Sequence, residues 1–238
     1  MSERTSTSRA RAERPTWVGI DPSKDEQGRA PLTRPRIVRA ALRLVDEQGL
    51  PALTMRALAT ELKVSTMALY NHVRDKDELT DLMLDLMLGE VDCSPAEGDW
   101  FAQLRTLACS YHMALSAHTN LVRVYSTKIR LGPHSLMVME RVLGLLLEAG
   151  FSSADAADAF FALYTYIVGF HQMGRAAPLP NPTSHADGTV GYYTALPPEQ
   201  VPSIMAVSRH LEGARRPGGF EYGLDVFLDG LQAQVRHR

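Results

Sequence analysis

The stretch TMRALATELKVSTMALYNHVRDKDEL, residues 54–79, decides the fold class, because its apolar spacing predicts two short helices joined by a tight turn. Thr54 is a suitable N-cap for the first helix, and Ser65 is a suitable N-cap for the second. Asp75 begins another helix, and Glu78 three residues later gives the pair the spacing of a capping box. Two short helices with a turn of about three residues between them have the dimensions of a helix-turn-helix.

The segments on both sides of this stretch also carry the helical period. A longer helix over residues 34–49 precedes it, with Thr33 as its N-cap and Gly49 as its C-terminal stop. Apolar residues recur three and four positions apart through most of the remaining chain, whereas the alternation typical of strands is hardly seen. We therefore expect an all-α protein. Further helices are expected near residues 99–117, 119–127, 133–149, 152–174, 199–213 and 220–236.

Composition divides the chain into three parts. Residues 1–32 are rich in Ser, Thr, Arg and Pro without sustained apolar periodicity, and we expect them to form a flexible arm. Alternatively, Arg4, Arg9, Arg11 and Arg14 of this arm add contacts to a polyanion. Residues 33–79 are expected to form an N-terminal three-helix bundle that contains the helix-turn-helix, and residues 80–238 a larger C-terminal helical domain. A Pro-rich stretch over residues 176–202 is expected to be a loop within that larger domain.

Charge is unevenly distributed along the chain, although its total is only −2. Residues 1–80 hold 14 Lys and Arg against 11 Asp and Glu, whereas the remaining 158 residues hold 11 against 16. The first part therefore carries a net charge of +3 and the rest a net charge of −5. A polyanionic partner would be attracted to the basic N-terminal part and repelled by the acidic body.

Several classes of protein are excluded by composition. An apolar share of 45% rules out global disorder. Cys93 and Cys109 lie outside any disulfide or zinc pattern, which suits a reducing compartment. The N-terminus has no secretory signal, and the most apolar segment, residues 160–170, is too short to cross a bilayer. We expect a soluble cytoplasmic protein with no membrane partner.

The third helix, expected over residues 66–72, has two different faces. Leu69 and Val73 are four residues apart and point toward the core. The opposite face carries hydroxyl, thioether, phenol and amide groups, from Thr66, Met67, Tyr70 and Asn71. Such groups donate and accept hydrogen bonds and contact thymine methyl groups, as a reader of the DNA major groove must. Taken alone, the same pattern also fits an ordinary short surface helix.

Residues 54–79 resemble the DNA-binding signature of the TetR family of bacterial transcriptional regulators. The specific part of this signature is the cluster Leu69-Tyr70, His72-Val73, Lys76 and Leu79. The following chain is similar to the tetracycline-repressor branch, of actinobacterial type, at Trp100, Leu104, Ala114, Leu115, His118, Gly132-Pro133 and Gly150-Phe151-Ser152. The resemblance covers residues 33–237. It implies a DNA-binding module followed by a helical domain that dimerises and encloses a small-molecule pocket.

The resemblance also implies which residues contact DNA. Arg56 matches a position that reads a base edge, and Arg suits the guanine O6/N7 pair. The recognition-helix positions that face DNA are Thr66, Met67, Ala68, Tyr70 and Asn71. Phosphate contacts are implied for Thr54, His72 and Lys76. Lys63 departs from the family, whose turn usually has Gly, and a positive φ there would cost Lys about 1 kcal/mol relative to Gly.

The remaining helices are expected to bind an effector and to dimerise. Residues 152–174 are apolar on nearly all sides, and the last helix adds more apolar surface. These two helices from each protomer are expected to form a four-helix homodimer interface. Alternatively, both helices belong to the core of a single chain. The effector-pocket positions of tetracycline repressors correspond here to Leu107, Tyr111, Tyr125, Met139, Val142, Tyr164 and Met173, side chains that would also suit an ordinary core.

The differences from tetracycline repressors predict a different effector. Tyr125 and Met173 stand where that branch has a metal-binding His and Glu, and Val142 stands where it has a drug-binding Gln. Phenol and thioether groups are poor ligands for magnesium, which prefers hard oxygen ligands. We therefore expect a small apolar or aromatic effector that binds without a metal or another cofactor.

The expected function is that of a repressor released from a palindromic double-stranded DNA operator by its effector. An enzyme is one alternative, but no HExxH, GxSxG, Walker A or GxGxxG motif stands at a strand-to-helix junction, and His112 and His118 lie on different helix faces. His171 in an apolar helix is interpreted as a hydrogen-bonded core residue. A helical adaptor is another alternative, although it would not need Arg56 and Lys76 in their signature positions.

Overall fold

The computed structural model describes residues 31–125, 132–173, 196–208 and 218–236, and these residues form helices and no strand. The helices are α1 (Arg34–Gln48), the 3-10 helix η1 (Leu50–Ala52), α2 (Met55–Leu62), α3 (Thr66–Tyr70), α4 (Lys76–Leu88), α5 (Trp100–Ala117), α6 (Thr119–Tyr125), α7 (Pro133–Glu148), α8 (Ser153–Met173), α10 (Pro202–Val207) and α11 (Gly218–Arg236). The expected all-α class is confirmed. None of the described helices is both long enough and apolar enough to span a membrane.

The short helices begin where the sequence places capping residues. The hydroxyl groups of Thr54 and Ser65 each accept the backbone N–H of the residue three positions later, at 3.0 and 3.2 Å. The carboxylate of Asp75 does the same at the start of α4, at 2.7 Å. Each cap satisfies one of the N–H groups that the first helical turn leaves unpaired. Local chemistry therefore determines the starts of α2, α3 and α4.

Two details near α4 differ from expectation. The third helix ends at Tyr70, two residues earlier than expected, because the following residues turn toward α4. The Glu78 carboxylate accepts the backbone N–H of Arg74 at 2.6 Å, whereas a capping box would have it accept the N–H of Asp75. Glu78 therefore fastens the turn one residue before the cap.

The C-terminal part of the chain differs more. The helix expected over residues 199–213 begins only at Pro202, as α10, because a proline disfavours helical geometry in the residue before it. The end of that prediction lies outside the described residues. Most of the arm expected over residues 1–32 and most of the loop expected over residues 176–202 lie outside them as well.

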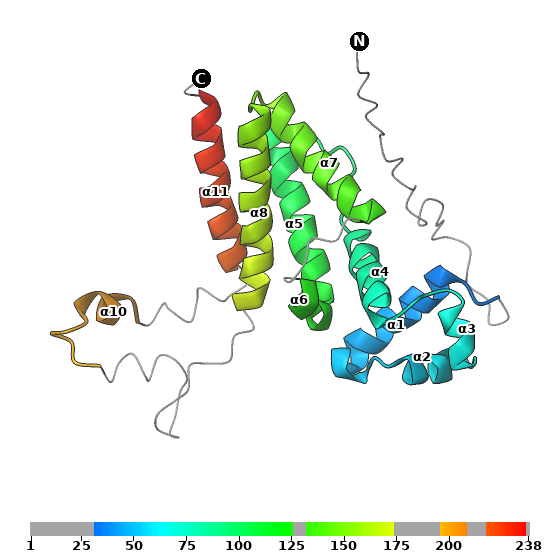
Figure 1. Ribbon diagram of the computed structural model, residues 1–238. Coiled ribbons are helices and arrows are strands. Elements are labelled where there is room, and N and C mark those ends of the chain that lie inside the picture. Colours follow the sequence, from blue (N-terminus) through cyan, green and yellow to red (C-terminus); the bar gives the residue numbers. More distant parts are fainter. Residues whose placement is uncertain (1–30, 126–131, 174–195, 209–217, 237–238) are drawn as a thin grey trace, which may run out of the picture.

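α4 connects the small N-terminal bundle to the rest of the molecule. α1 packs against α2 and α4, and α2 packs against α3. α5, α7, α8 and α11 form a bundle, and Figure 1 shows α1, α2 and α3 gathered at the far end of α4 from it. Ile37, Leu69 and Met83 are fully buried in the apolar core that runs from the small bundle into α4. Truncating such a side chain to Ala typically costs about 2–5 kcal/mol.

Candidate DNA-binding surface and effector pocket

The turn between α2 and α3 is tight because α2 ends in a left-handed residue. Lys63 has φ 56° and ψ 43°, and it is the only non-glycine residue of the described chain with a positive φ. Its N–H donates to the carbonyl of Thr60 at 3.1 Å, and the N–H of Val64 donates to the carbonyl of Ala59 at 3.0 Å. This pair of bonds defines a Schellman motif, whose left-handed position is usually Gly. The structure therefore meets the condition under which Lys63 is strained.

The two faces of α3 are divided as the sequence indicates. Leu69 and Val73 are buried, with 0% and 1% of their surface exposed. On the other face Met67 is 72% exposed and Tyr70 is 47% exposed. Met67 and Tyr70 are three residues apart on α3, so these two exposed side chains lie next to each other on one face. The exposed thioether and phenol therefore form a surface suited to a partner.

The other candidate DNA-contacting residues lie around this face. Arg56, Asn71 and Lys76 are exposed, and so is Thr54. Thr66, Ala68 and His72 are half-buried. Because the Thr54 hydroxyl accepts a bond as a helix cap, its own O–H remains a donor that can reach a phosphate oxygen. The side chains named from the sequence are thus accessible in whole or in part.

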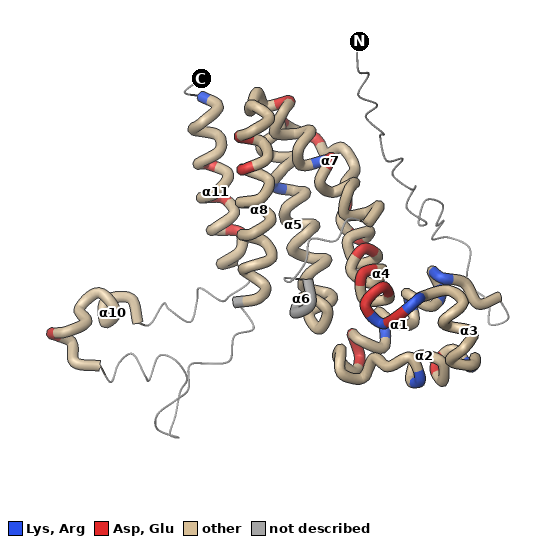
Figure 2. The backbone as a smooth tube through the Cα atoms, in the orientation of Figure 1, with Lys and Arg blue, Asp and Glu red and all other residues tan. Residues whose placement is uncertain are grey.

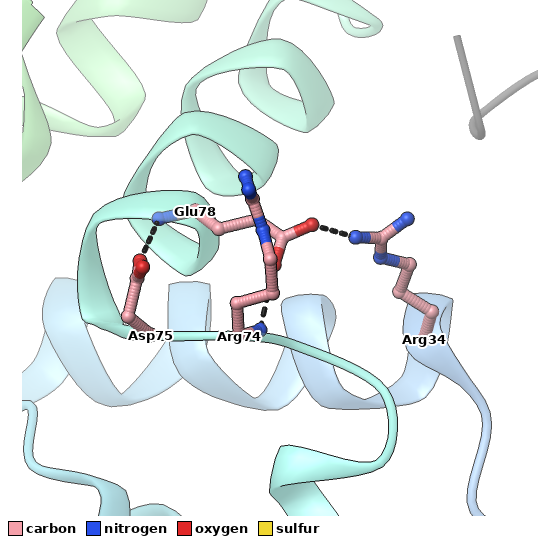
Figure 3. A network of polar contacts seen from close by, with 4 residues as sticks. All are labelled: Arg34, Arg74, Asp75 and Glu78. Carbon is pink, nitrogen blue, oxygen red and sulfur yellow. Dashed lines mark hydrogen bonds and ion pairs between the residues drawn. The ribbon is translucent and has the colours of Figure 1, made fainter.

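Glu78 of α4 joins the first turn of that helix to the start of α1 and to the turn between α3 and α4 (Figure 3). Its carboxylate is ion-paired with Arg34 at the start of α1, and it accepts the Nε–H of Arg74 at 3.2 Å. It also accepts the backbone N–H of Arg74, directly before the Asp75 cap of α4. The Glu78 side chain is only 14% exposed and Arg34 is 22% exposed, so their ion pair is partly shielded from water, whereas Arg74 is 83% exposed. The sequence predicted Glu78 as a capping partner but gave no sign of its contact with α1.

Charge is segregated around α4 (Figure 2). Lys and Arg outnumber Asp and Glu over residues 34–74, which include α1, α2 and the turn before α4, whereas Asp and Glu predominate along α4. The excess of basic groups therefore lies at the end of the molecule that carries α2 and α3. A polyanion would be attracted to that end, as the distribution of charge along the sequence predicts.

A small apolar cavity lies between α5, α7 and α8. Its volume is about 10 Å³, close to the space of one water molecule. Four of the seven predicted pocket residues line it, namely Leu107, Tyr111, Val142 and Tyr164. It is completed by Ala108, Val138, Phe160, Leu163 and Ile167, which sequence reasoning missed although most lie three or four residues from a predicted one.

The structure tests only one of the remaining three predicted pocket residues. Met139 is half-buried on α7 but does not line the cavity. Tyr125 and Met173 are the last residues of α6 and α8, and their side chains lie outside what the structure describes. The residues that do line the cavity are aliphatic or aromatic and include no charged group. Such a lining favours an apolar or aromatic ligand.

An aspartate on α4 caps the N-terminus of α7. Asp85 Oδ1 accepts the backbone N–H groups of His134 and Ser135, both at 3.1 Å. Its Oδ2 lies 2.9 Å from Nδ1 of the His134 ring, and this carboxylate raises the pKa of His134. A Cβ at Gly132 would lie 2.1 Å from Asp85 Oδ1, so glycine is required there. The contact links the connecting helix α4 to a wall of the cavity.

A second link joins α6 to the end of α1. The Asn120 side-chain amide donates to the carbonyl groups of Val45 and Asp46, both at 3.1 Å. His118, which is buried, lies between two carboxylates, with Nδ1 2.8 Å from Asp46 and Nε2 3.0 Å from Glu90. The Asn120 amide thus gives a second donor to the Val45 carbonyl, which already accepts the N–H of Gly49, and also donates to the carbonyl of Asp46. The helical body therefore contacts the small bundle at two separate places.

A helix-turn-helix with an exposed recognition face, joined to a helical body with an internal apolar cavity, defines a class of DNA-binding regulators. The chain belongs to the TetR family. A model of bacterial regulatory proteins of the tetR family matches residues 37–83, and a model of the tetracyclin repressor-like C-terminal domain matches residues 93–235. The resemblance found in the sequence is thereby confirmed.

Three proteins of known class are similar to this chain over most of its length. The HTH-type transcriptional repressor DrrR1 of Streptomyces coeruleorubidus is 36% identical over 87% of this chain and 80% of its own length. The tetracycline repressor class A from transposon 1721 of Escherichia coli is 32% identical over 82% of this chain and 88% of its own. The crystal structure of the TetR family protein ActR of Streptomyces coelicolor in complex with actinorhodin has a TM-score of 0.73 at 32% identity, covering 86% of this chain and 97% of that one.

These matches define the function at the level of the family. The chain is a ligand-responsive, DNA-binding transcriptional repressor. Its relatives regulate transcription, which supports the regulator over the enzyme that the sequence left as an alternative.

Proposed function

We propose that the chain is a homodimeric repressor whose residues 33–79 bind a palindromic operator and whose residues 80–238 bind an aromatic effector and dimerise. The exposed face of α3, with Met67 and Tyr70 directed away from a fully buried Leu69, is the observation that carries the DNA-binding part. Two such helices placed about 34–36 Å apart in a dimer would enter successive major grooves of one DNA face.

The proposed roles follow the chemistry of each position. Arg56 reads a base edge from the first turn of α2, and the exposed face of α3 contacts bases in the major groove. Thr54, His72 and Lys76 contact phosphates, and Lys76 also stands at the N-terminus of α4, where backbone N–H groups favour an anion. Glu78 supports these contacts indirectly, because it fixes the turn before Lys76.

The dimer interface is proposed on α8 and α11. These two helices pack against each other, and they present apolar side chains that the chain itself leaves uncovered. Phe161 is 46% exposed on α8, and Tyr222 and Val226, four residues apart on α11, are 75% and 56% exposed. A two-fold axis beside these helices would bury all three in a four-helix interface.

The effector is proposed to be an aromatic molecule that binds without a metal. The cavity has an apolar and aromatic lining, and ActR, which shares this fold at 32% identity, binds actinorhodin. An effector that separates α7 from α5 and α8 would pull on Asp85 and therefore on α4, which carries the small bundle. A coupling of about 1–3 kcal/mol is typical of such systems and changes DNA affinity about 5- to 150-fold.

Selection of bound sites from random DNA by the purified protein tests the DNA-binding proposal. We expect enrichment of a palindrome. Arg56→Ala should lose preference at particular base positions, whereas Lys76→Ala should weaken binding to all sequences alike and reduce its salt dependence. Failure to enrich a palindrome, or equal effects of the two variants on specific and random DNA, would contradict these roles.

Titration with ligands tests the effector proposal separately. Actinorhodin should bind and release the protein from the selected DNA, whereas magnesium-tetracycline should not bind. Micromolar affinity for magnesium-tetracycline would refute the metal-free pocket, because a metal complex of that strength requires hard oxygen or imidazole ligands.

A further inference from the structure

Two histidines follow cavity-lining residues along α5 and α8. On α8, His171 follows the cavity residues Tyr164 and Ile167 by seven and four positions, so it lies on the same helix face one turn further on. On α5, His112 follows the cavity residue Ala108 by four positions. The centroids of the two imidazole rings are 4.6 Å apart. The apolar wall of the cavity is therefore followed by a pair of polar rings.

Aromatic neighbours hold these rings in place. His112 stacks on Phe220 of α11, with centroids 3.8 Å apart and planes inclined by 12°. Phe170 meets His112 edge-on at 5.7 Å. Tyr166 donates its hydroxyl to the carbonyl of Phe220 at 2.6 Å, which fixes the start of α11 against α8. The orientation of the pair is thus determined by three helices.

The pair has hydrogen-bonding capacity that the described chain does not use. His171 is only 9% exposed, and its Nε2 has no hydrogen-bond partner. Nδ1 of His112 is likewise buried and unpartnered. The expectation that His171 is a hydrogen-bonded core residue is met by its hydrogen bond with the backbone of His112, whereas its Nε2 has no partner. Leaving a buried polar group unpaired costs about 1–3 kcal/mol, a cost that apolar residues in these positions would not carry.

We propose that His112 and His171 form the polar end of the effector pocket and bind a neutral oxygen of the effector, a hydroxyl or a quinone carbonyl, while its rings occupy the apolar part. This inference rests on the proposed function and narrows the effector class. An aromatic molecule without such an oxygen would leave both nitrogens unpaired and bind more weakly.

The protonation of the pair supports a neutral partner. Burial and the neighbouring His112 lower the pKa of His171 to about 4, and burial lowers the pKa of His112, against the opposing effect of the Glu221 carboxylate. Both rings are therefore neutral at pH 7, and a neutral imidazole offers one N–H donor and one acceptor nitrogen. A hydroxyl group, which both donates and accepts, matches either nitrogen, and a carbonyl matches the donor.

Two aromatic probes of similar shape test the proposal. Calorimetric titration at pH 7 should give 2-naphthol about five- to tenfold higher affinity than 2-methylnaphthalene, the gain expected from one additional hydrogen bond. His171→Leu should abolish this preference while retaining affinity for 2-methylnaphthalene. Thr106→Val, on the exposed side of α5 and away from the proposed dimer helices, is the control and should retain the preference.

A second measurement uses the unmodified protein. With histidine labelled at its ring nitrogens, 2-naphthol should shift the Nε2 resonance of His171, and 2-methylnaphthalene should not. Three results would overturn the proposed role of the histidines: equal affinity for both probes, a preference that survives in His171→Leu, or an unshifted Nε2 resonance. None of these results would contradict the proposal that the effector is aromatic. If the wild-type protein binds neither probe nor actinorhodin, the proposal of an aromatic effector is wrong. The proposal that the two histidines bind its oxygen is then wrong as well.

Discussion

Replacement of Asp85 by Ala should both destabilise the protein and weaken the response to effector. The carboxylate caps α7 through two backbone N–H groups and pairs with the His134 ring, so one substitution removes three bonds between α4 and α7. Gly132, which approaches Asp85 too closely to carry a Cβ, would be left beside an empty space.

The magnitude follows from the bonds lost. Removal of a helix cap costs about 1 kcal/mol, and loss of a hydrogen bond to a partly buried charged group costs about 1.5 kcal/mol or more. The free energy of unfolding should therefore fall by about 2–3 kcal/mol, or about 4–12 °C in Tm for a domain of this size. Asp99→Ala is the matched control, because Asp99 is exposed and caps α5 with a bond of 2.9 Å to its own helix. It should cost about 1 kcal/mol.

Denaturant unfolding at one fixed protein concentration measures the first effect, since the stability of a dimer depends on concentration. DNA affinity with and without actinorhodin measures the second. We expect the effector-induced change in affinity to shrink in Asp85→Ala and to persist in Asp99→Ala. If the two variants lose equal stability and keep equal responses, Asp85 is an ordinary cap and α7 does not act on α4 through it.

Three further changes test other parts of the structure. Lys63→Gly should raise the free energy of unfolding by about 0.5–1 kcal/mol, because it removes left-handed strain, whereas Lys63→Ala should give no gain in the same denaturation assay. Glu78→Gln should lower stability by about 2 kcal/mol and weaken operator binding in a fluorescence-anisotropy titration, while the exposed neighbour Asp77→Asn changes neither appreciably. Because the folded-state pKa of His171 is lowered from 6.5 to about 4, the unfolded chain binds the extra proton in that window, so stability should fall by about 2 kcal/mol as pH drops from 6.5 to 4. His171→Leu should flatten this slope, and an unchanged slope would show that the ring is hydrated in the folded state.

Features determined by neighbouring residues could be predicted from the sequence. Caps such as Thr54 and Ser65 act over three residues, and the inward direction of Leu69 follows from helical spacing alone. The strained turn at Lys63 could be predicted conditionally, because the short spacing between two helices requires a sharp reversal. In each case the deciding interaction lies within one or two turns of the chain.

Features determined by distant residues could not be predicted in this way. Asp85 meets His134 across 49 positions, and nothing in the pattern of α4 separates it from the other acidic residues of that helix. The ion pair of Glu78 with Arg34 spans 44 positions. The pairing of His112 with His171 likewise depends on how α5 and α8 align, since each residue alone fits an ordinary helix face.

The cavity between α5, α7 and α8 also limits how fast the protein can respond. A space of about 10 Å³ admits no aromatic ring, so an effector enters only during moments when the helices separate. Association should then be slower than the roughly 10⁵–10⁷ M⁻¹s⁻¹ typical of accessible sites and should become independent of effector concentration once opening is rate-limiting. Release requires the same opening. The rate at which repression is lifted and the rate at which it returns would then both depend on this one opening of the helices.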